Sequence, residues 1–279
     1  MSRQSFSTKD ATGLEKYAAV YPEQPKYAVV GLDSQVVEVQ LAPGETIRAE
    51  PGVMMHMHPN TSLKMEMQPM CGCKSVCAGE SCCKVKYTNN DSAPQYIGLT
   101  PNFPAKVVPM ILRTGEKVRS KEGGYMAEIG NVDISIAFDC NPMTACFGGQ
   151  GCILQSLTGG EGDLNVAFLA AGGTVLEKTL GPEESIVIDT NSLVAWDSTV
   201  KLGLQPAGGF LGCCFGGEGC YNTKMTGPGR LIIQSMSFKK FVKALVPPGS
   251  GAAAAAGGAA VSAAGSAAGA PEEQEEMTR

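Results

Sequence analysis

The sequence has few of the residues that enzymes most often use for proton transfer. It contains only two histidines, His56 and His58, together with a single tryptophan and 6% aromatic residues. A Ser-His-Asp triad would therefore need one of these two histidines beside a nucleophile. No G-x-S-x-G segment is present to supply that nucleophile. The sequence predicts no catalytic residues, and we expect a protein that is not an enzyme.

The chain also lacks an excess of positive charge. Its formal net charge is −5, and residues 271–279 contribute four glutamates and one arginine to that total. The rest of the chain is therefore nearly neutral, which argues against a broad basic surface for nucleic acid or anionic lipid. We expect no nucleic-acid partner.

An apolar signal core is missing from the first residues, Met1-Ser2-Arg3-Gln4-Ser5-Phe6. The chain contains eleven cysteines, an odd number in a long chain, and this does not fit the disulfide framework of a small secreted domain. A reducing compartment is favoured, which predicts the cytoplasm.

Glycine is abundant, with 35 residues, and several glycines belong to a segment that recurs. Phe215-Gly216-Gly217-Glu218-Gly219-Cys220 matches Phe147-Gly148-Gly149-Gln150-Gly151-Cys152, and Ala78-Gly79-Glu80-Ser81-Cys82 is a weaker copy. The aligned cysteines at 82, 152 and 220 lie 70 and 68 residues apart. A second marker, at Glu45, Glu116 and Glu184, follows with intervals of 71 and 68 residues. Two markers with one period predict three internal repeats.

Alternating apolar residues predict that each repeat is built of strands, as in Gln35 to Leu41 and Val132 to Phe138. A unit of about 70 residues buries too little surface to be secure alone. The sequence therefore predicts an all-β fold in which three such units pack around a pseudo-threefold axis. The expected organisation is a mobile leader at 1–26, a β domain at 27–246 and a disordered Ala/Gly-rich, then acidic, tail at 247–279. The repeats are expected at 33–100, 101–170 and 171–242.

Several motifs resemble the altered inheritance of mitochondria protein 24 family. They are Gly216 to Gly219 followed by Thr226-Gly227-Pro228-Gly229, Leu41 to Glu45 followed by Glu50 to Met55, and Ala170 to Val175. The resemblance covers about Asp33 to Val242. It implies a tryptophan RNA-binding attenuator-like (TRAP-like) β-sandwich of the double-stranded β-helix type, a mitochondrial location for eukaryotic members and a poorly defined molecular role. It supplies no catalytic residues.

A cluster of cysteines is the strongest chemical lead in the sequence. It comprises Cys71, Cys73, Cys77, Cys82 and Cys83, and His56 and His58 lie upstream. Thiolates and imidazoles can build a tetrahedral zinc site. The spacing C-x-C-x₃-C-x₄-C-C is not a common zinc spacing, and cysteine also serves as a small apolar residue in tight packing. Packing, metal binding and redox chemistry all remain open at this point.

The glycine-rich segments could be mistaken for phosphate-binding loops. They lack the P-loop spacing, and an alternating strand follows them rather than a helix. We expect a structural role, in which glycines permit close backbone approach or positive φ. These motif residues are Gly79, Glu80, Gly148, Gly149, Gly151, Gly216, Gly217 and Gly219.

The sequence thus favours a non-enzymatic structural or interaction protein that needs no cofactor, and it identifies no small-molecule substrate. Its expected partners are further copies of itself or other proteins, including a partner close to a membrane. The alternative is a cysteine-dependent metal-binding or redox protein. A weaker alternative, by analogy of fold alone, is RNA binding.

Overall fold

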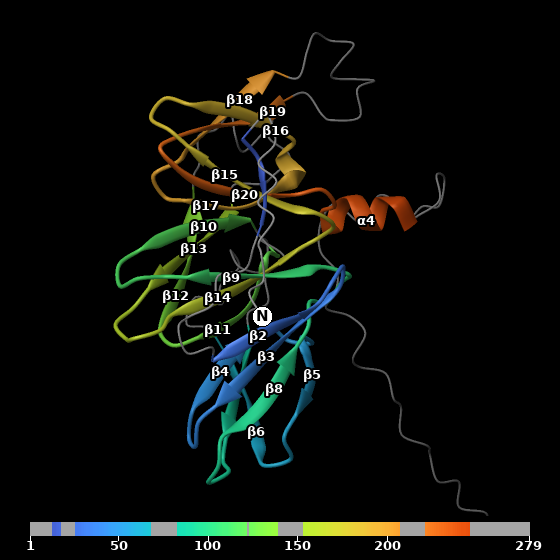
Figure 1. The fold of residues 1–279 in the computed structure, drawn as a ribbon, viewed down its shortest axis with the longest axis vertical. Helices are drawn as coiled ribbons and strands as arrows, with labels where there is room; N and C mark the ends of the chain where they lie inside the picture. Colours follow the sequence, from blue (N-terminus) through green and yellow to red (C-terminus); the bar gives the residue numbers. More distant parts are fainter. Residues whose placement is uncertain are drawn as a thin grey trace, which may run out of the picture.

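The structure is a computed structural model that describes residues 13–17, 26–67, 83–121, 123–138, 153–206 and 221–245 (Figure 1). Within these ranges the chain forms twenty strands, a 3-10 turn η1 (Thr190–Ser192) and one α-helix, α4 (Phe238–Leu245). Every pairing between two strands is antiparallel. The predicted all-β class is confirmed. The internal repeat, the pseudo-threefold axis and the TRAP-like arrangement stay predictions.

The strands form four sheets. The four-stranded sheet has the order β2 (Tyr27–Gly31), β3 (Gln35–Leu41), β8 (Gln95–Leu99), β5 (Met54–Met57). The six-stranded sheet has the order β6 (Thr61–Met67), β7 (Cys83–Asn89), β4 (Thr46–Ala49), β11 (Tyr125–Ile129), β14 (Val166–Ala171), β9 (Lys106–Ile111).

The seven-stranded sheet has the order β1 (Glu15–Lys16), β15 (Val175–Leu180), β20 (Gly229–Gln234), β17 (Leu193–Asp197), β10 (Lys117–Lys121), β13 (Ile153–Gly159), β12 (Val132–Phe138). The three-stranded sheet has the order β16 (Ser185–Ile188), β19 (Tyr221–Thr226), β18 (Lys201–Pro206). In Figure 1 strands β2 to β6 and β8 occupy one end of the long axis, and strands β16, β18 and β19 occupy the other.

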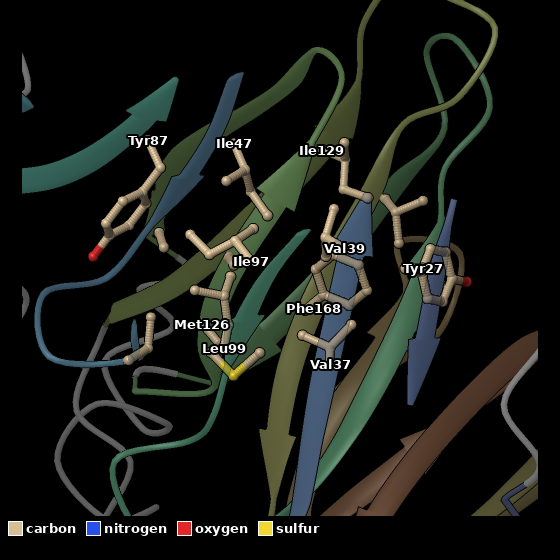
Figure 2. Close-up of a cluster of buried hydrophobic side chains, with 14 of the residues drawn as sticks. Tyr27, Val37, Val39, Ile47, Tyr87, Ile97, Leu99, Met126, Ile129 and Phe168 are labelled. Carbon is tan, nitrogen blue, oxygen red and sulfur yellow. The ribbon is translucent and has the colours of Figure 1, made fainter. Parts of the chain in front are cut away.

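Three apolar cores hold neighbouring sheets together. The first lies between the four- and six-stranded sheets, where Tyr27 meets Phe168 edge-on with ring centroids 5.0 Å apart (Figure 2). The second joins the six- and seven-stranded sheets, for example through Leu169 and Leu157. The third joins the seven- and three-stranded sheets around Trp196. The sheets therefore follow one another in a stack, and the inner sheets serve two cores each.

Burial patterns along the strands reflect this stacking. In β3, Val37, Val39 and Leu41 are buried and alternate with less buried residues, as expected for a strand with one covered face. In β14, by contrast, all six residues are buried. A strand buried on both faces reads as a continuous apolar run, and Val166-Ala167-Phe168-Leu169-Ala170-Ala171 has that composition.

Three turns share one geometry. In each turn, a glutamate carboxylate accepts the N–H of the residue three positions earlier, and the N–H of the glutamate is donated to the carbonyl of that residue. The pairs are Glu45 with Ala42, Glu116 with Arg113 and Glu184 with Gly181, with carboxylate distances of 2.8, 2.9 and 2.9 Å. The residue before each glutamate has a positive φ, which is 75° at Gly44, 78° at Gly115 and 60° at Glu183. The second sequence marker therefore encodes a turn that the carboxylate closes.

Two short elements lie at the ends of the described chain. Strand β1 falls within the segment expected as a leader and pairs with β15, and Tyr17 Oη donates a hydrogen bond of 2.9 Å to the carbonyl of Pro109. Helix α4 contacts the body through Phe238, whose ring centroid is 5.3 Å from that of Phe103. No helix among the described residues has the length and apolar character needed to span a membrane.

Candidate functional site: a buried ion cluster and an open sheet edge

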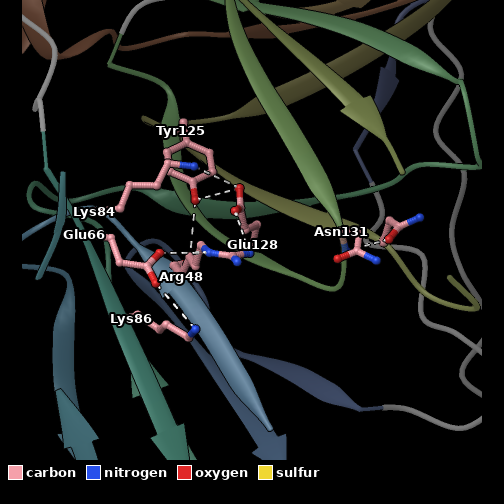
Figure 3. Close-up of polar contacts among 8 residues, drawn as sticks. Arg48, Glu66, Lys84, Lys86, Tyr125, Glu128 and Asn131 are labelled. Atoms are coloured by element: carbon pink, nitrogen blue, oxygen red, sulfur yellow. Dashed lines mark hydrogen bonds and ion pairs between the residues drawn. The ribbon is translucent and has the colours of Figure 1, made fainter. Parts of the chain in front are cut away.

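Charged side chains form a continuous cluster on one face of the six-stranded sheet (Figure 3). They come from four neighbouring strands: Arg48 on β4, Glu66 on β6, Lys84 and Lys86 on β7, and Glu128 on β11. The strand register places Arg48 opposite both Lys86 and Glu128. Because successive residues of a strand point to opposite faces, these side chains face away from the first core.

The inner end of the cluster is buried. Glu128 Oε2 accepts hydrogen bonds from Lys84 Nζ at 3.2 Å and from Tyr125 Oη at 3.0 Å. The side chains of Lys84 and Glu128 are only 8% and 2% exposed. Lys84 Nζ also lies 4.7 Å from the centre of the Tyr125 ring, which adds a cation–π contact. This arrangement satisfies the buried carboxylate from two sides.

The outer end of the cluster reaches the surface through Arg48. Its Nη1 is 3.8 Å from Glu128 Oε1, and its Nε donates to Glu66 Oε2 at 3.2 Å. Lys86 Nζ lies 3.4 Å from the other oxygen of Glu66. Glu66 is 40% exposed, so the charge on this edge strand remains accessible to solvent while two cations orient it.

At the buried end of the cluster, the environment shifts the pKa values of Glu128 and Tyr125. Burial raises the pKa of Glu128, although Lys84, Tyr125 and Arg48 each act to lower it. Burial, followed by the neighbouring Glu128 carboxylate, raises the pKa of Tyr125 well above its ordinary value of 10.0. The phenol therefore stays protonated and acts as a hydrogen-bond donor to Glu128.

A cavity of about 130 Å³ lies beside the cluster. Tyr125 lines it together with Glu50, Phe103, Met126 and Gln155. Its volume is below the roughly 300 Å³ at which pockets for drug-sized ligands begin. The Tyr125 hydroxyl donates to Glu128 rather than pointing into the cavity as a free group for a ligand. The contacts of the cluster described above all join residues of this chain. These contacts hold four strands in position.

The second feature is the outer edge of β6. Leu63, Met65 and Met67 are exposed by 47%, 55% and 73%. They lie opposite Tyr87, Val85 and Cys83 of β7, so they project from the same face that carries the first core. No other described strand pairs with the outer edge of β6. The apolar face of this sheet thus extends beyond the core and remains uncovered in the described chain.

Two other hairpins provide a comparison. Strands β12 and β18 are also sheet edges, each paired with the strand that follows it. On β12, Ile134 is half-buried and packs against the second core. On β18, Leu202 is half-buried and packs against the third core. Among the described side chains of these three edges, the exposed large apolar ones are confined to β6.

The structure places three of the predicted metal candidates. His56 Nε2 lies 2.8 Å from Glu38 Oε1 on the surface, and His58 Nδ1 lies 3.8 Å from Asp91 Oδ2 and accepts the N–H of Asn60 at 3.3 Å. Cys83 is half-buried at the start of β7. Within the described ranges, no three His, Cys, Asp or Glu side chains gather as a metal-binding group.

The remaining candidates lie outside the described residues. These are Cys71, Cys73, Cys77 and Cys82, and the motif residues Gly79, Glu80, Gly148, Gly149, Gly151, Gly216, Gly217 and Gly219. The metal and redox hypotheses therefore stay predictions, as does the structural role of the glycine-rich segments.

Sequence reasoning missed the ion cluster. Lys84 lies between Cys83 and Val85, which share one face of β7 with Tyr87, so the alternation alone suggests that Lys84 points to solvent. The available signal was in β11, where Tyr125-Met126-Ala127-Glu128-Ile129 places one acid in an apolar run. All five positions are buried, and a buried carboxylate requires a partner.

The stack of antiparallel sheets defines a multi-sheet all-β protein with no helical domain among its described residues. The model of the family described as "Mitochondrial biogenesis AIM24" matches residues 27–236, and the chain belongs to that family. The chain is similar to an uncharacterized protein of Streptococcus pyogenes serotype M6, with 27% identity over 220 residues, covering 75% of this chain and 85% of that protein.

A solved structure shows a similar fold. It is the X-ray crystal structure of a Streptococcus pyogenes protein, with a TM-score of 0.61 and 21% sequence identity. The match covers 78% of this chain and 97% of that one. At this identity the likeness concerns the fold alone, and neither relative carries a description of its activity.

Proposed function

We propose that this chain is a non-enzymatic structural protein that acts by binding other polypeptides through the outer edge of β6. The observation that carries the proposal is the uncovered strip of Leu63, Met65 and Met67, which continues the apolar face of the first core. Edge strands with exposed apolar side chains readily pair with another chain, and isolated proteins usually protect such edges.

The ion cluster supports a structural role for its charged residues. Lys84 and Tyr125 both donate to Glu128, and Arg48 links Glu128 to Glu66 on β6. A buried ion pair contributes little net stability, but removing one member is costly. The cluster is therefore suited to holding β4, β6, β7 and β11 in one register, which keeps the outer strand in place for a partner.

The test compares two variants that differ only in position. Three tagged chains are expressed in cells, cross-linked briefly and purified with their bound proteins. They are the wild type, Met65→Lys and the control Val187→Lys. Val187 is an exposed residue of β16, which is the edge strand of another sheet. We expect Met65→Lys to lose bound proteins that the wild type and Val187→Lys retain. Equal recovery from all three would show that β6 is not the binding edge.

The compartment is a separate question. The sequence predicts the cytoplasm, whereas the family description names mitochondrial biogenesis. Fluorescence microscopy of the tagged chain with a mitochondrial marker distinguishes the two locations and identifies the protein pool from which partners are drawn.

A further inference from the structure

Strand β6 is complementary to itself. Its sequence is Thr61-Ser62-Leu63-Lys64-Met65-Glu66-Met67. When two copies run antiparallel and meet at Met65, Leu63 of each copy faces Met67 of the other, and Lys64 faces Glu66. Facing residues of an antiparallel pair project from the same side of the sheet. One side of the pairing is therefore apolar, and the other joins opposite charges.

We propose that two copies of this chain associate edge to edge through β6, antiparallel, about a two-fold axis at Met65. The inference rests on the proposed function, since it names the partner of the same edge as a second copy. A two-fold interface requires one patch to be complementary to itself, and this strand meets that requirement in both its apolar and its charged residues. The six-stranded sheet then continues from one copy into the next.

The apolar side of the pairing is continuous with the first core. Leu63 and Met65 are paired across the sheet with Tyr87 and Val85, which are only 2% and 4% exposed. Met67 is 73% exposed and gains the most cover when it faces Leu63 of the second copy. Burying these side chains removes apolar surface from water at the point where each core is open.

The charged side distinguishes β6 from the other edges. Among the sheet-edge strands of the described chain that exceed two residues, β6 alone carries both an acidic and a basic residue. Strand β12 carries Asp133 and strand β18 carries Lys201, so neither can cross-pair opposite charges. Arg48 and Lys86 hold Glu66 on this face, and its 40% exposure leaves it accessible to Lys64 of a second copy.

The experiment measures self-association of the purified full chain. Sedimentation velocity is recorded over a concentration series, in reductant so that cysteines cannot cross-link copies. We expect a reversible monomer–dimer equilibrium. Met65→Lys places two like charges directly opposite at the axis, and we expect it to raise the dissociation constant by at least about tenfold. Val187→Lys, the matched change on β16, is expected to leave it within about twofold.

A charge exchange tests the register itself. Lys64→Glu and Glu66→Lys should each weaken dimers of their own kind, because like charges then face one another. An equal mixture of the two variants should form mixed dimers, since every facing pair again joins opposite charges. Glu66→Lys also removes the contacts with Arg48 and Lys86, so circular dichroism checks its fold. If that variant does not fold, weakening of dimers in Lys64→Glu alone decides the charge pairing.

The outcomes separate this inference from the proposed function. Dimers that persist in Met65→Lys and Lys64→Glu would overturn the β6 pairing while self-association stands. A chain that stays monomeric up to about 100 µM would also overturn the pairing. The capture of other proteins by β6 is measured independently by the cross-linking comparison.

Discussion

The Lys84→Met substitution tests whether the buried cluster carries real charge. Lys84 Nζ is 3.2 Å from Glu128 Oε2, and the two side chains are 8% and 2% exposed. Methionine keeps most of the stem volume but removes the cation nearest to the carboxylate. Glu128 then retains Tyr125 Oη at 3.0 Å and Arg48 Nη1 at 3.8 Å.

Removing one member of a buried pair costs about 3–5 kcal/mol, because the remaining charge is left buried without compensation. The two contacts that remain to Glu128 place the expected loss at the lower end, about 3 kcal/mol. Replacing both members, in Lys84→Met with Glu128→Leu, should recover most of that loss, since no charge is left buried. The control is Lys224→Met, at an exposed position of β19, with an expected cost of about 0.5 kcal/mol or less.

Urea unfolding supplies the measurement. Trp196 is the single tryptophan and is 1% exposed, so its fluorescence reports loss of the third core. Circular dichroism follows all four sheets, and agreement between the two signals shows that unfolding is two-state. Reductant keeps the eleven cysteines from forming disulfides during the experiment.

The pH dependence of stability gives a second test of the buried charge on Glu128. Burial raises the pKa of Glu128 above its ordinary 4.5, so folding favours the protonated form, and the contribution of this group falls as pH rises from 4.5 through the raised value. Without Lys84 the pKa rises further. The deficit of Lys84→Met should therefore shrink as the pH falls through the raised pKa of Glu128, because both proteins then hold a neutral Glu128. A deficit below about 1 kcal/mol, or one independent of pH, would refute the assignment of a buried charge.

Three further predictions concern other parts of the chain. Glu183→Gly relieves a φ of 60° at a residue with a side chain, and it should stabilise the fold by about 0.5–1 kcal/mol in urea unfolding. Gly115→Ala introduces a side chain where φ is 78°, although no atom contacts the added Cβ, and it should destabilise the fold by about 1 kcal/mol. A result of the same sign for both would contradict the strain argument. We expect that folding needs no metal, so chelation should leave the circular dichroism unchanged. A structural zinc would contribute on the order of 10 kcal/mol, so its removal would unfold the protein visibly. Stoichiometric zinc that is lost in Cys73→Ser would favour the metal hypothesis instead. Removing residues after Pro248 should leave the melting temperature within a few degrees, since that Ala/Gly-rich and acidic composition offers little apolar surface to bury. A larger fall would mean that this segment packs on the β body.

Local patterns predicted the strands well. The alternation at Gln35 to Leu41 and at Val132 to Phe138 predicted the bounds of β3 and β12. In β3 the alternation arises because one face of the strand is covered and the other is less so. The glutamate marker also had a physical meaning, since its carboxylate closes a turn. Neither signal required knowledge of distant contacts.

The ion cluster and the open edge could not be predicted in the same way. Lys84 is polar in an alternating strand, and only the packing of a further sheet makes its position a buried one. Met65 is apolar in an alternating strand, which predicts burial, yet β6 lies beyond the sheet that covers its neighbours. The burial of Lys84 and the exposure of Met65 both depend on where the sheets end. The ends of the sheets depend in turn on the pairing order of strands that are far apart in the sequence.

Strand β14 imposes a constraint on how this chain can change in evolution. Phe168 projects into the first core, while Ala167 and Leu169 project into the second. Adding or deleting one residue within the strand would exchange the two sets and place the large ring where a methyl group now fits. Substitutions can be absorbed on either side by repacking, but a change in length would damage two cores at once. We therefore expect relatives of this chain to vary in β14 by residue type and to keep its length fixed.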